Sequence, residues 1–158
     1  MQNIRISFYV LSESKAQDFL GFVCQLTQTV LTKSRESLLI LSEDEALLHE
    51  LDAALWTYES TSFIPHTLLS NAHLANESVA LDYKAAPVSL ATYIPTSFKG
   101  IVVNTTARPI TDLISGTSTA VPTRILEIIK PEASSVDEGR LKYKRYQALG
   151  YELTHFKV

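Results

Sequence analysis

The sequence is poor in the residues that mark unstructured, disulfide-bonded or membrane-spanning chains. Only 5 glycines and 6 prolines occur in 158 residues, which argues against collagen-like, low-complexity and linker-rich organisation. The single cysteine, Cys24, cannot form an internal disulfide, which fits a reducing compartment. No apolar run approaches the ~20 residues that a membrane span needs, and the start, MQNIRISFYV, does not resemble a signal peptide. We therefore expect a cytoplasmic protein that does not enter a membrane.

Positive charge is also scarce. Lysine and arginine total 14 against 17 acidic residues, so the formal net charge is −3. Proteins that bind nucleic acid unaided usually carry a positive field, so we expect little direct nucleic-acid binding. The 46% hydrophobic and 20% charged residues are typical of a globular chain, and the length predicts one domain over residues 1–158.

Apolar strands alternate with amphipathic helices along the chain. Strands are expected at 4–11, 37–41, 79–83, 100–104, 125–130 and 151–156, with an edge strand or extended loop at 62–69. Helices are expected at 14–33, 42–56 and 136–149, with a short helix at 109–114, while the Thr- and Ser-rich stretch 105–123 is typical of a flexible loop. This order predicts a three-layer α/β/α fold with a central, mostly parallel or mixed sheet.

The motifs that equip such folds for catalysis are missing. The turn after the first strand reads SESKAQD, without the glycines that let a backbone approach a pyrophosphate, and GxxxxGK[ST] and GxSxG are absent. Cys24 lies within an amphipathic helix and is expected to be a core thiol. The four histidines lack metal-ligand spacing. The sequence predicts a Rossmann-like fold without a phosphate-binding loop, catalytic residues, metal or cofactor. The alternative is an α/β nucleotide-binding protein or enzyme with an unrecognised site.

The only tryptophan stands in an unusual place. Trp56 lies on the polar flank of the predicted helix 42–56, outside its apolar stripe, and Phe63 and Pro65 follow within a short loop. Either Trp56 packs beneath that loop as core, or it is an aromatic anchor for a partner protein.

A basic stretch, RLKYKRY at 140–146, places four cations in six positions of an acidic protein. Arg140, Tyr143, Lys144 and Gln147 share one helical face. Such a face suits an acidic peptide that also carries an apolar side chain, because arginine can hold a carboxylate with two hydrogen bonds and tyrosine offers a flat apolar wall. The alternative is a solvated helix whose cations complement the dipole at its C-terminal end.

Three blocks of the sequence resemble the chi subunit family of bacterial DNA polymerase III holoenzyme. They are ISFYVL, LLILSEDEALLHELDAALWTYESTSFIPH and RLKYKRYQALGYEL, and together they cover about half the chain. The middle block, which joins an acidic cap, LDxALW and SFIPH, is the most specific. In the last block, Gln147 stands where the family commonly has arginine.

The resemblance implies a noncatalytic accessory subunit associated with the clamp loader in the bacterial replisome. Chi proteins have an α/β/α fold without a phosphate loop, bind the psi subunit with one surface, and bind the acidic C-terminal tail of single-stranded DNA-binding protein with another. The resemblance places the psi-binding surface at Leu55, Trp56, Phe63, Ile64 and Pro65. It places the tail-binding surface at Arg140, Tyr143, Lys144 and Gln147, with Ile128 and Ile129 as apolar neighbours.

Overall fold

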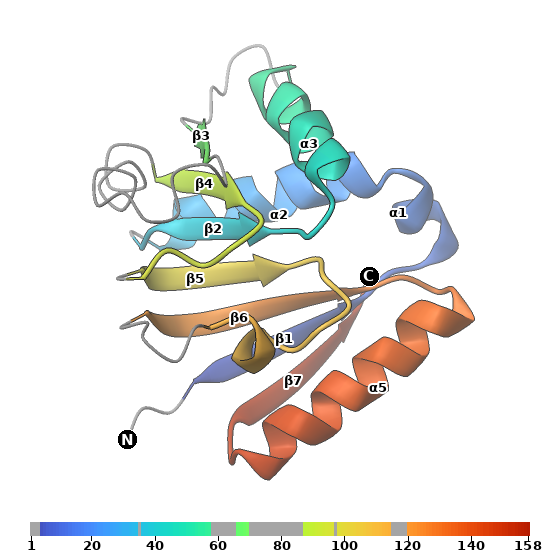
Figure 1. Cartoon of the computed structure of the whole chain (residues 1–158). Helices are drawn as coiled ribbons and strands as arrows, with labels where there is room; N and C mark the ends of the chain where they lie inside the picture. The colour runs from blue at the N-terminus through green and yellow to red at the C-terminus, as the bar shows by residue number, and fades with distance from the viewer. Residues whose placement is uncertain (1–3, 35, 58–65, 70–86, 97, 115–119) are drawn as a thin grey trace.

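The computed structural model describes residues 4–34, 36–57, 66–69, 87–96, 98–114 and 120–158. These residues form a seven-stranded parallel sheet of order β3-β4-β2-β5-β6-β1-β7 (Figure 1). The strands are β1 (Arg5–Val10), β2 (Leu38–Leu41), β3 (His66–Leu68), β4 (Val88–Ala91), β5 (Lys99–Asn104), β6 (Val121–Ile129) and β7 (Glu152–Lys157). The helices are α1 (Glu13–Gln17), α2 (Phe19–Lys33), α3 (Glu45–Thr57) and α5 (Ala133–Ala148), and a 3₁₀ turn, η2, spans Ile110–Asp112.

Helices cover both faces of this sheet, which confirms the predicted α/β/α layering. Helices α2 and α3 pack on one face, and α5 and η2 pack on the other (Figure 1). Because side chains alternate along a strand, β2 sends Leu38 and Ile40 into the first core and Leu39 and Leu41 into the second. All four are buried, as expected for an inner strand of a parallel sheet that is covered on both sides.

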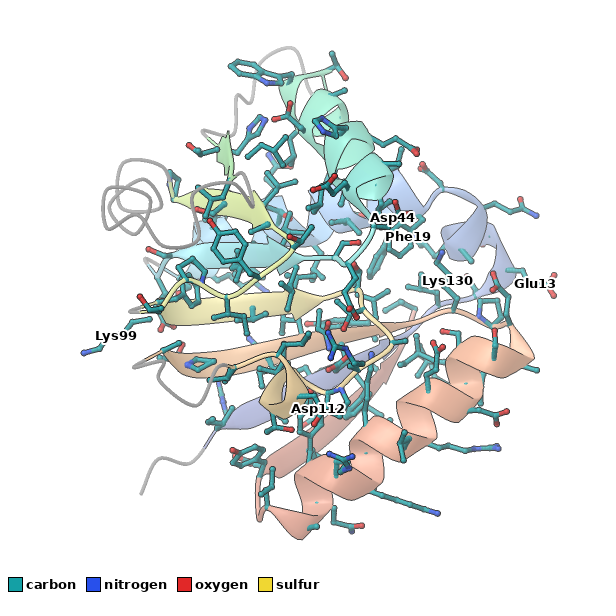
Figure 2. All side chains as sticks on the ribbon, viewed as in Figure 1. Glu13, Phe19, Asp44, Lys99, Asp112 and Lys130 are labelled. Carbon is teal, nitrogen blue, oxygen red and sulfur yellow. The ribbon has the colours of Figure 1, made fainter. Side chains whose placement is uncertain are left out.

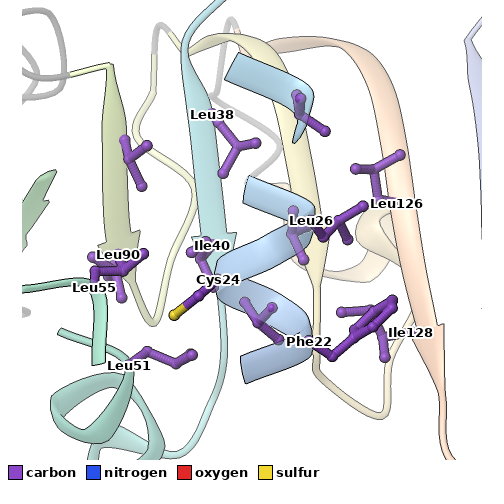
Figure 3. Close-up of a cluster of buried hydrophobic side chains, with 14 of the residues drawn as sticks. Phe22, Cys24, Leu26, Leu38, Ile40, Leu51, Leu55, Leu90, Leu126 and Ile128 are labelled. Atoms are coloured by element: carbon purple, nitrogen blue, oxygen red, sulfur yellow. The ribbon is translucent and has the colours of Figure 1, made fainter. Parts of the chain in front are cut away.

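Cys24 is a core thiol, as predicted. It is fully buried in the cluster beneath α2 and α3, where Ile40 and Leu51 also lie (Figure 3). Burial, helped by the negative charge of Asp18, raises the pKa of the Cys24 thiol to about 11. The thiol is therefore protonated at neutral pH, which removes the thiolate that a nucleophile needs.

Some predicted elements differ from those observed. The expected helix 14–33 is two helices, because the Asp18 carboxylate accepts a hydrogen bond from Gly21 N (3.2 Å) and starts α2 afresh. Strand β4 was not predicted, and the expected strand 79–83 lies outside the described residues. Within the stretch 105–123, η2 lies in the range expected for a short helix, 109–114, but the end of the expected loop belongs to β6, which begins at Val121 and not at residue 125.

A tight turn connects α5 to the outer strand β7. Gly150 N donates to Gln147 O (3.0 Å) and Tyr151 N donates to Tyr146 O (3.2 Å), the pattern of a Schellman motif. Gly150 has a φ of 80°, which glycine adopts without a Cβ penalty. The rings of Tyr146 and Tyr151 pack 6.2 Å apart across the turn. The turn sends β7 back along β1, beside α5.

Candidate functional site

A pocket of about 390 Å³ lies between α5 and the sheet, over β1 and β7; we call it the α5 pocket. Its apolar lining comes from Phe8 and Val10 of β1, Ile129 of β6, and Val136 and Gly139 of α5. Its remaining lining residues are Arg140, Tyr143 and Lys144 of α5 and His155 of β7. The result is a mainly apolar hollow with cations on its helical wall.

Gly139 lets α5 approach the sheet closely at the floor of this pocket. A Cβ built on Gly139 would lie 2.7 Å from Cδ1 of Ile129, closer than real Cβ atoms come. Any larger residue would therefore have to displace Ile129 or the helix, and both belong to the pocket lining.

Three rings meet at the sheet side of the pocket. His155 stacks on Phe8, with ring centroids 5.3 Å apart and an interplanar angle of 21°. Tyr143 lies 5.1 Å from His155 and 5.8 Å from Phe8. These contacts join α5, β1 and β7 and give the pocket a flat aromatic wall.

The cations of the pocket point to solvent without strong partners. Arg140 and Lys144 are exposed, one helical turn apart. Asp137 approaches Arg140 at 3.7 Å, but both side chains are strongly exposed, and such pairs contribute little. Among the described residues, no carboxylate lines the α5 pocket. Its local charge is therefore positive although the chain is acidic.

A neighbouring face of α5, which also points to the sheet, carries a buried ionic network that sequence reasoning did not find. Nζ of Lys142 lies 2.9 Å from Oε1 of Glu127 and also donates to Thr106 O. The Tyr146 hydroxyl donates to Oε2 of Glu127 (2.6 Å) and accepts from Ile110 N (2.9 Å). Burial and the neighbouring Glu127 charge raise the pKa of Tyr146 well above its usual value.

Asn104, at the end of β5, completes this network. Its Nδ2 donates to Glu127 Oε2 (2.8 Å) and to Arg108 O (2.9 Å), and its Oδ1 accepts from Thr106 N (3.0 Å). The network ties α5 to β5, β6 and the segment before η2. It thereby fixes the rotation of α5 and keeps Arg140 and Lys144 on the pocket side.

Four of the six residues expected at the tail-binding surface line the α5 pocket: Ile129, Arg140, Tyr143 and Lys144. Ile128 does not, because neighbouring strand residues face opposite sides of the sheet; it packs in the cluster that contains Phe22 (Figure 3). Gln147 is exposed further along α5 and does not line the pocket. The contributions of β1 and β7 were missed, because the sequence did not show that these strands lie side by side.

The other expected surface is described only in part. Trp56, at the end of α3, is 57% exposed, so it is not a core residue. Its ring meets the edge of His66 at 5.1 Å, and His66 Nε2 lies 3.0 Å from Oδ1 of Asp52. Leu55 is buried with Leu51 and does not share the exposed face. Phe63, Ile64 and Pro65 lie outside the described residues.

The carboxyl ends of the strands, where open α/β folds usually bind ligands, hold a smaller hollow of about 170 Å³ between β6, α2 and α5. Lys130 lies at its rim with Nζ 4.5 Å from the centre of the Phe19 ring, and both residues are labelled in Figure 2. Glu132 and Glu138 also line it. The turn after β1, where a phosphate loop would lie, forms the glycine-free helix α1.

Two features are absent from the part of the chain that the structure describes. No three histidine, cysteine, aspartate or glutamate residues gather as metal ligands. No helix among these residues is long and apolar enough to cross a membrane.

The sequence matches one known protein family over nearly its whole length. The family model described as "DNA polymerase III chi subunit, HolC" matches residues 2–154. The chain belongs to the chi subunit family. The chi subunit of Pseudomonas aeruginosa is 26% identical over 157 residues, covering 98% of this chain and 96% of the relative. The chi subunit of Escherichia coli K12 is 26% identical over 150 residues, covering 93% of each. Membership in the chi family assigns the chain to the accessory subunits of DNA polymerase III and so to DNA replication.

Solved structures of other proteins share the fold. T4 UvsW matches with a TM-score of 0.65 at 10% identity, over 99% of this chain and 41% of that one. Domain 2 of the Mss116p DEAD-box helicase, bound to an RNA duplex, matches with a TM-score of 0.56 at 9% identity, over 97% of this chain and 64% of that one. This chi-family chain therefore has the α/β architecture of helicase domains. At such low identity the likeness concerns the fold alone.

Proposed function

We propose that this chain is a noncatalytic adaptor of the cytoplasmic replisome with two binding surfaces. The α5 pocket binds the acidic C-terminal tail of single-stranded DNA-binding protein, and the surface around Trp56 binds the psi subunit, which links the chain to the clamp loader. The observation that carries the proposal is the α5 pocket, an apolar hollow flanked by two exposed cations and lined by no carboxylate of the described residues.

The chemistry of the pocket matches that of the tail. The tail is acidic and ends in an apolar residue with a free carboxylate, as the family resemblance implies. The terminal side chain would enter the hollow against Ile129 and Tyr143, and its carboxylate would face Arg140. The apolar contact contributes affinity that salt does not screen, whereas the charges contribute a part that salt weakens. Direct nucleic-acid binding is not required, in keeping with the net charge of −3.

Calorimetric titration of the whole chain with the tail peptide tests this site. We expect saturable binding, a large loss when the peptide lacks its terminal apolar residue, and weaker binding at high salt. A scrambled peptide of the same composition is the control, because it keeps the charge and loses the apolar end. Equal affinity for the tail and the scrambled peptide would reduce the pocket to a nonspecific cationic patch.

The psi surface rests on the exposure of Trp56. A large aromatic side chain that is 57% exposed at the end of a helix is typical of an interface anchor. We expect Trp56→Ala to weaken psi binding by roughly 2 kcal/mol or more, with little change in melting temperature. Leu149→Ala, which truncates an exposed apolar residue at the far end of α5, is the matched control and should leave psi binding unchanged. Unaltered psi affinity in Trp56→Ala would remove Trp56 from the interface.

A nucleotide-binding or enzymatic role has less support. The hollow at the carboxyl ends of the strands is lined by Glu132 and Glu138 as well as Lys130, so its charge does not single out a phosphate, and α1 has no glycine-rich loop. We expect purified protein neither to hydrolyse ATP nor to bind it in a titration. Turnover that disappears with a point substitution in this chain would contradict the adaptor proposal.

A further inference from the structure

His155 lies beyond the blocks that carry the family resemblance, yet it forms a wall of the α5 pocket. His155 is exposed, and its ring stacks on Phe8 and contacts the tilted ring of Tyr143. Among the described residues, no hydrogen bond or ion pair engages the ring nitrogens of His155. The ring is therefore held in place while its polar atoms are available to a ligand.

The groups that face His155 are basic or aromatic. Helix α5 contributes Arg140, Lys144 and the phenol ring of Tyr143, and β1 contributes only apolar side chains. Lys157 follows two residues later on the same face of β7. With no carboxylate lining the pocket in the described part of the chain, a protonated His155 ring has no acidic partner within it.

We propose that His155 is a third cationic contact for the acidic peptide, so that tail binding strengthens as pH falls. This inference rests on the proposed function of the α5 pocket. Arg140 and Lys144 approach the peptide from the helix, and His155 approaches it from the sheet, so a carboxylate at the mouth is held from two sides. Histidine side chains change charge between about pH 5 and pH 8, whereas the peptide carboxylates stay ionised over most of that range.

The test is titration of the whole chain with the tail peptide at about pH 6 and about pH 8, within the range over which histidine changes charge. We expect the wild-type protein to bind roughly threefold to tenfold more tightly at the lower pH, the gain of one partly exposed charge contact. His155→Gln, which keeps a flat polar side chain but cannot gain charge, should bind with the same affinity at both pH values. His49→Gln, on α3, is the matched control and should keep the wild-type pH response.

The outcomes separate the inference from the proposed function. If His155→Gln keeps the full pH response, His155 is not the titrating contact, and the inference fails while the tail site stands. If the wild-type protein binds the peptide equally at both pH values, the inference fails in the same way. If the peptide does not bind at either pH, both fail. Should His155→Gln fold poorly, His155→Phe keeps the ring stack and must show the same loss of pH response.

Discussion

The two sides of helix α5 carry the same kinds of residue in opposite environments. On the inner side, Lys142 and Tyr146 are buried and contact Glu127. On the pocket side, Lys144 and Tyr143 border an apolar hollow that opens to solvent. A lysine and a tyrosine thus form a buried ionic contact in one place, and in the other they border the pocket for which we propose ligand binding. The difference lies in the surroundings of their polar atoms: those of Lys142 and Tyr146 contact the buried Glu127 carboxylate, whereas Lys144 and Tyr143 border a mainly apolar pocket without a carboxylate.

The four cations of the basic stretch 140–146 do not form one positively charged patch. Of its four cations, Lys142 is buried in an ion pair with Glu127, and Arg145 pairs with Asp112 at 3.0 Å. Only Arg140 and Lys144 contribute positive charge to the α5 pocket. The stretch therefore combines structural residues with residues of the proposed binding site on one helix, and substitutions in the two groups should affect different properties.

The largest expected effect comes from Lys142→Met. It removes one member of a buried ion pair and leaves Glu127 charged without its partner, which typically costs ~3–5 kcal/mol of unfolding free energy. Urea denaturation measures the loss. Lys144→Met is the matched control and should change unfolding by no more than about 0.5 kcal/mol, because Lys144 is exposed. Equal losses in the two variants would break the distinction between the two sides.

Tyr146→Phe tests the inner side with a smaller change. The phenol hydroxyl bridges Glu127 and the Ile110 amide, so its removal leaves a buried donor and an acceptor each short of one partner. We expect a destabilisation of about 1–3 kcal/mol in thermal or urea unfolding. Tyr143→Phe is the control on the pocket side and should leave stability nearly unchanged. A stable Tyr146→Phe protein would mean that water or a shift of η2 replaces the hydroxyl.

Arg140→Ala tests the pocket side. We expect about tenfold weaker binding of the tail peptide, equivalent to ~1.4 kcal/mol, with unfolding free energy unchanged because Arg140 is exposed. Arg140→Lys should recover part of the affinity, since an ammonium group cannot make the paired hydrogen bonds of a guanidinium. Psi binding should be unaffected, because Trp56 lies on a different helix. Wild-type tail affinity in Arg140→Ala would place the peptide elsewhere.

Local sequence patterns predicted most of the fold. Alternating apolar strands and helices indicated the α/β layers, and β1, β2, β5 and α3 lie within a few residues of their expected ranges. Strand β4 was missed because four buried residues after a proline resemble a loop end as much as a strand. The order of the strands depends on long-range pairing, which one sequence does not show.

The candidate site was predicted from one side only. Helical periodicity brought Arg140, Tyr143 and Lys144 together, and the structure places all three at one pocket. The opposite wall comes from β1 and β7, which are far apart in the chain but adjacent in the sheet. Strand alternation by itself could have shown that Ile128 and Ile129 face opposite ways, so that only one of them can meet α5.

Arg145→Ala has the smallest expected effect. Arg145 belongs neither to the buried network around Glu127 nor to the α5 pocket, so its loss should affect stability and tail binding only weakly. Its guanidinium pairs with Asp112 of η2 at 3.0 Å, and both side chains are substantially exposed. Such a pair contributes about 0.2–1 kcal/mol, which a double-mutant cycle with Asp112→Ala would resolve. Tail binding should change less than about twofold at physiological salt, because Arg145 does not line the α5 pocket, its charge is paired with Asp112, and salt screens exposed charges. A tenfold loss of tail affinity in Arg145→Ala would extend the binding surface across the exposed side of α5, and the peptide would then follow the charge of the helix rather than the apolar pocket.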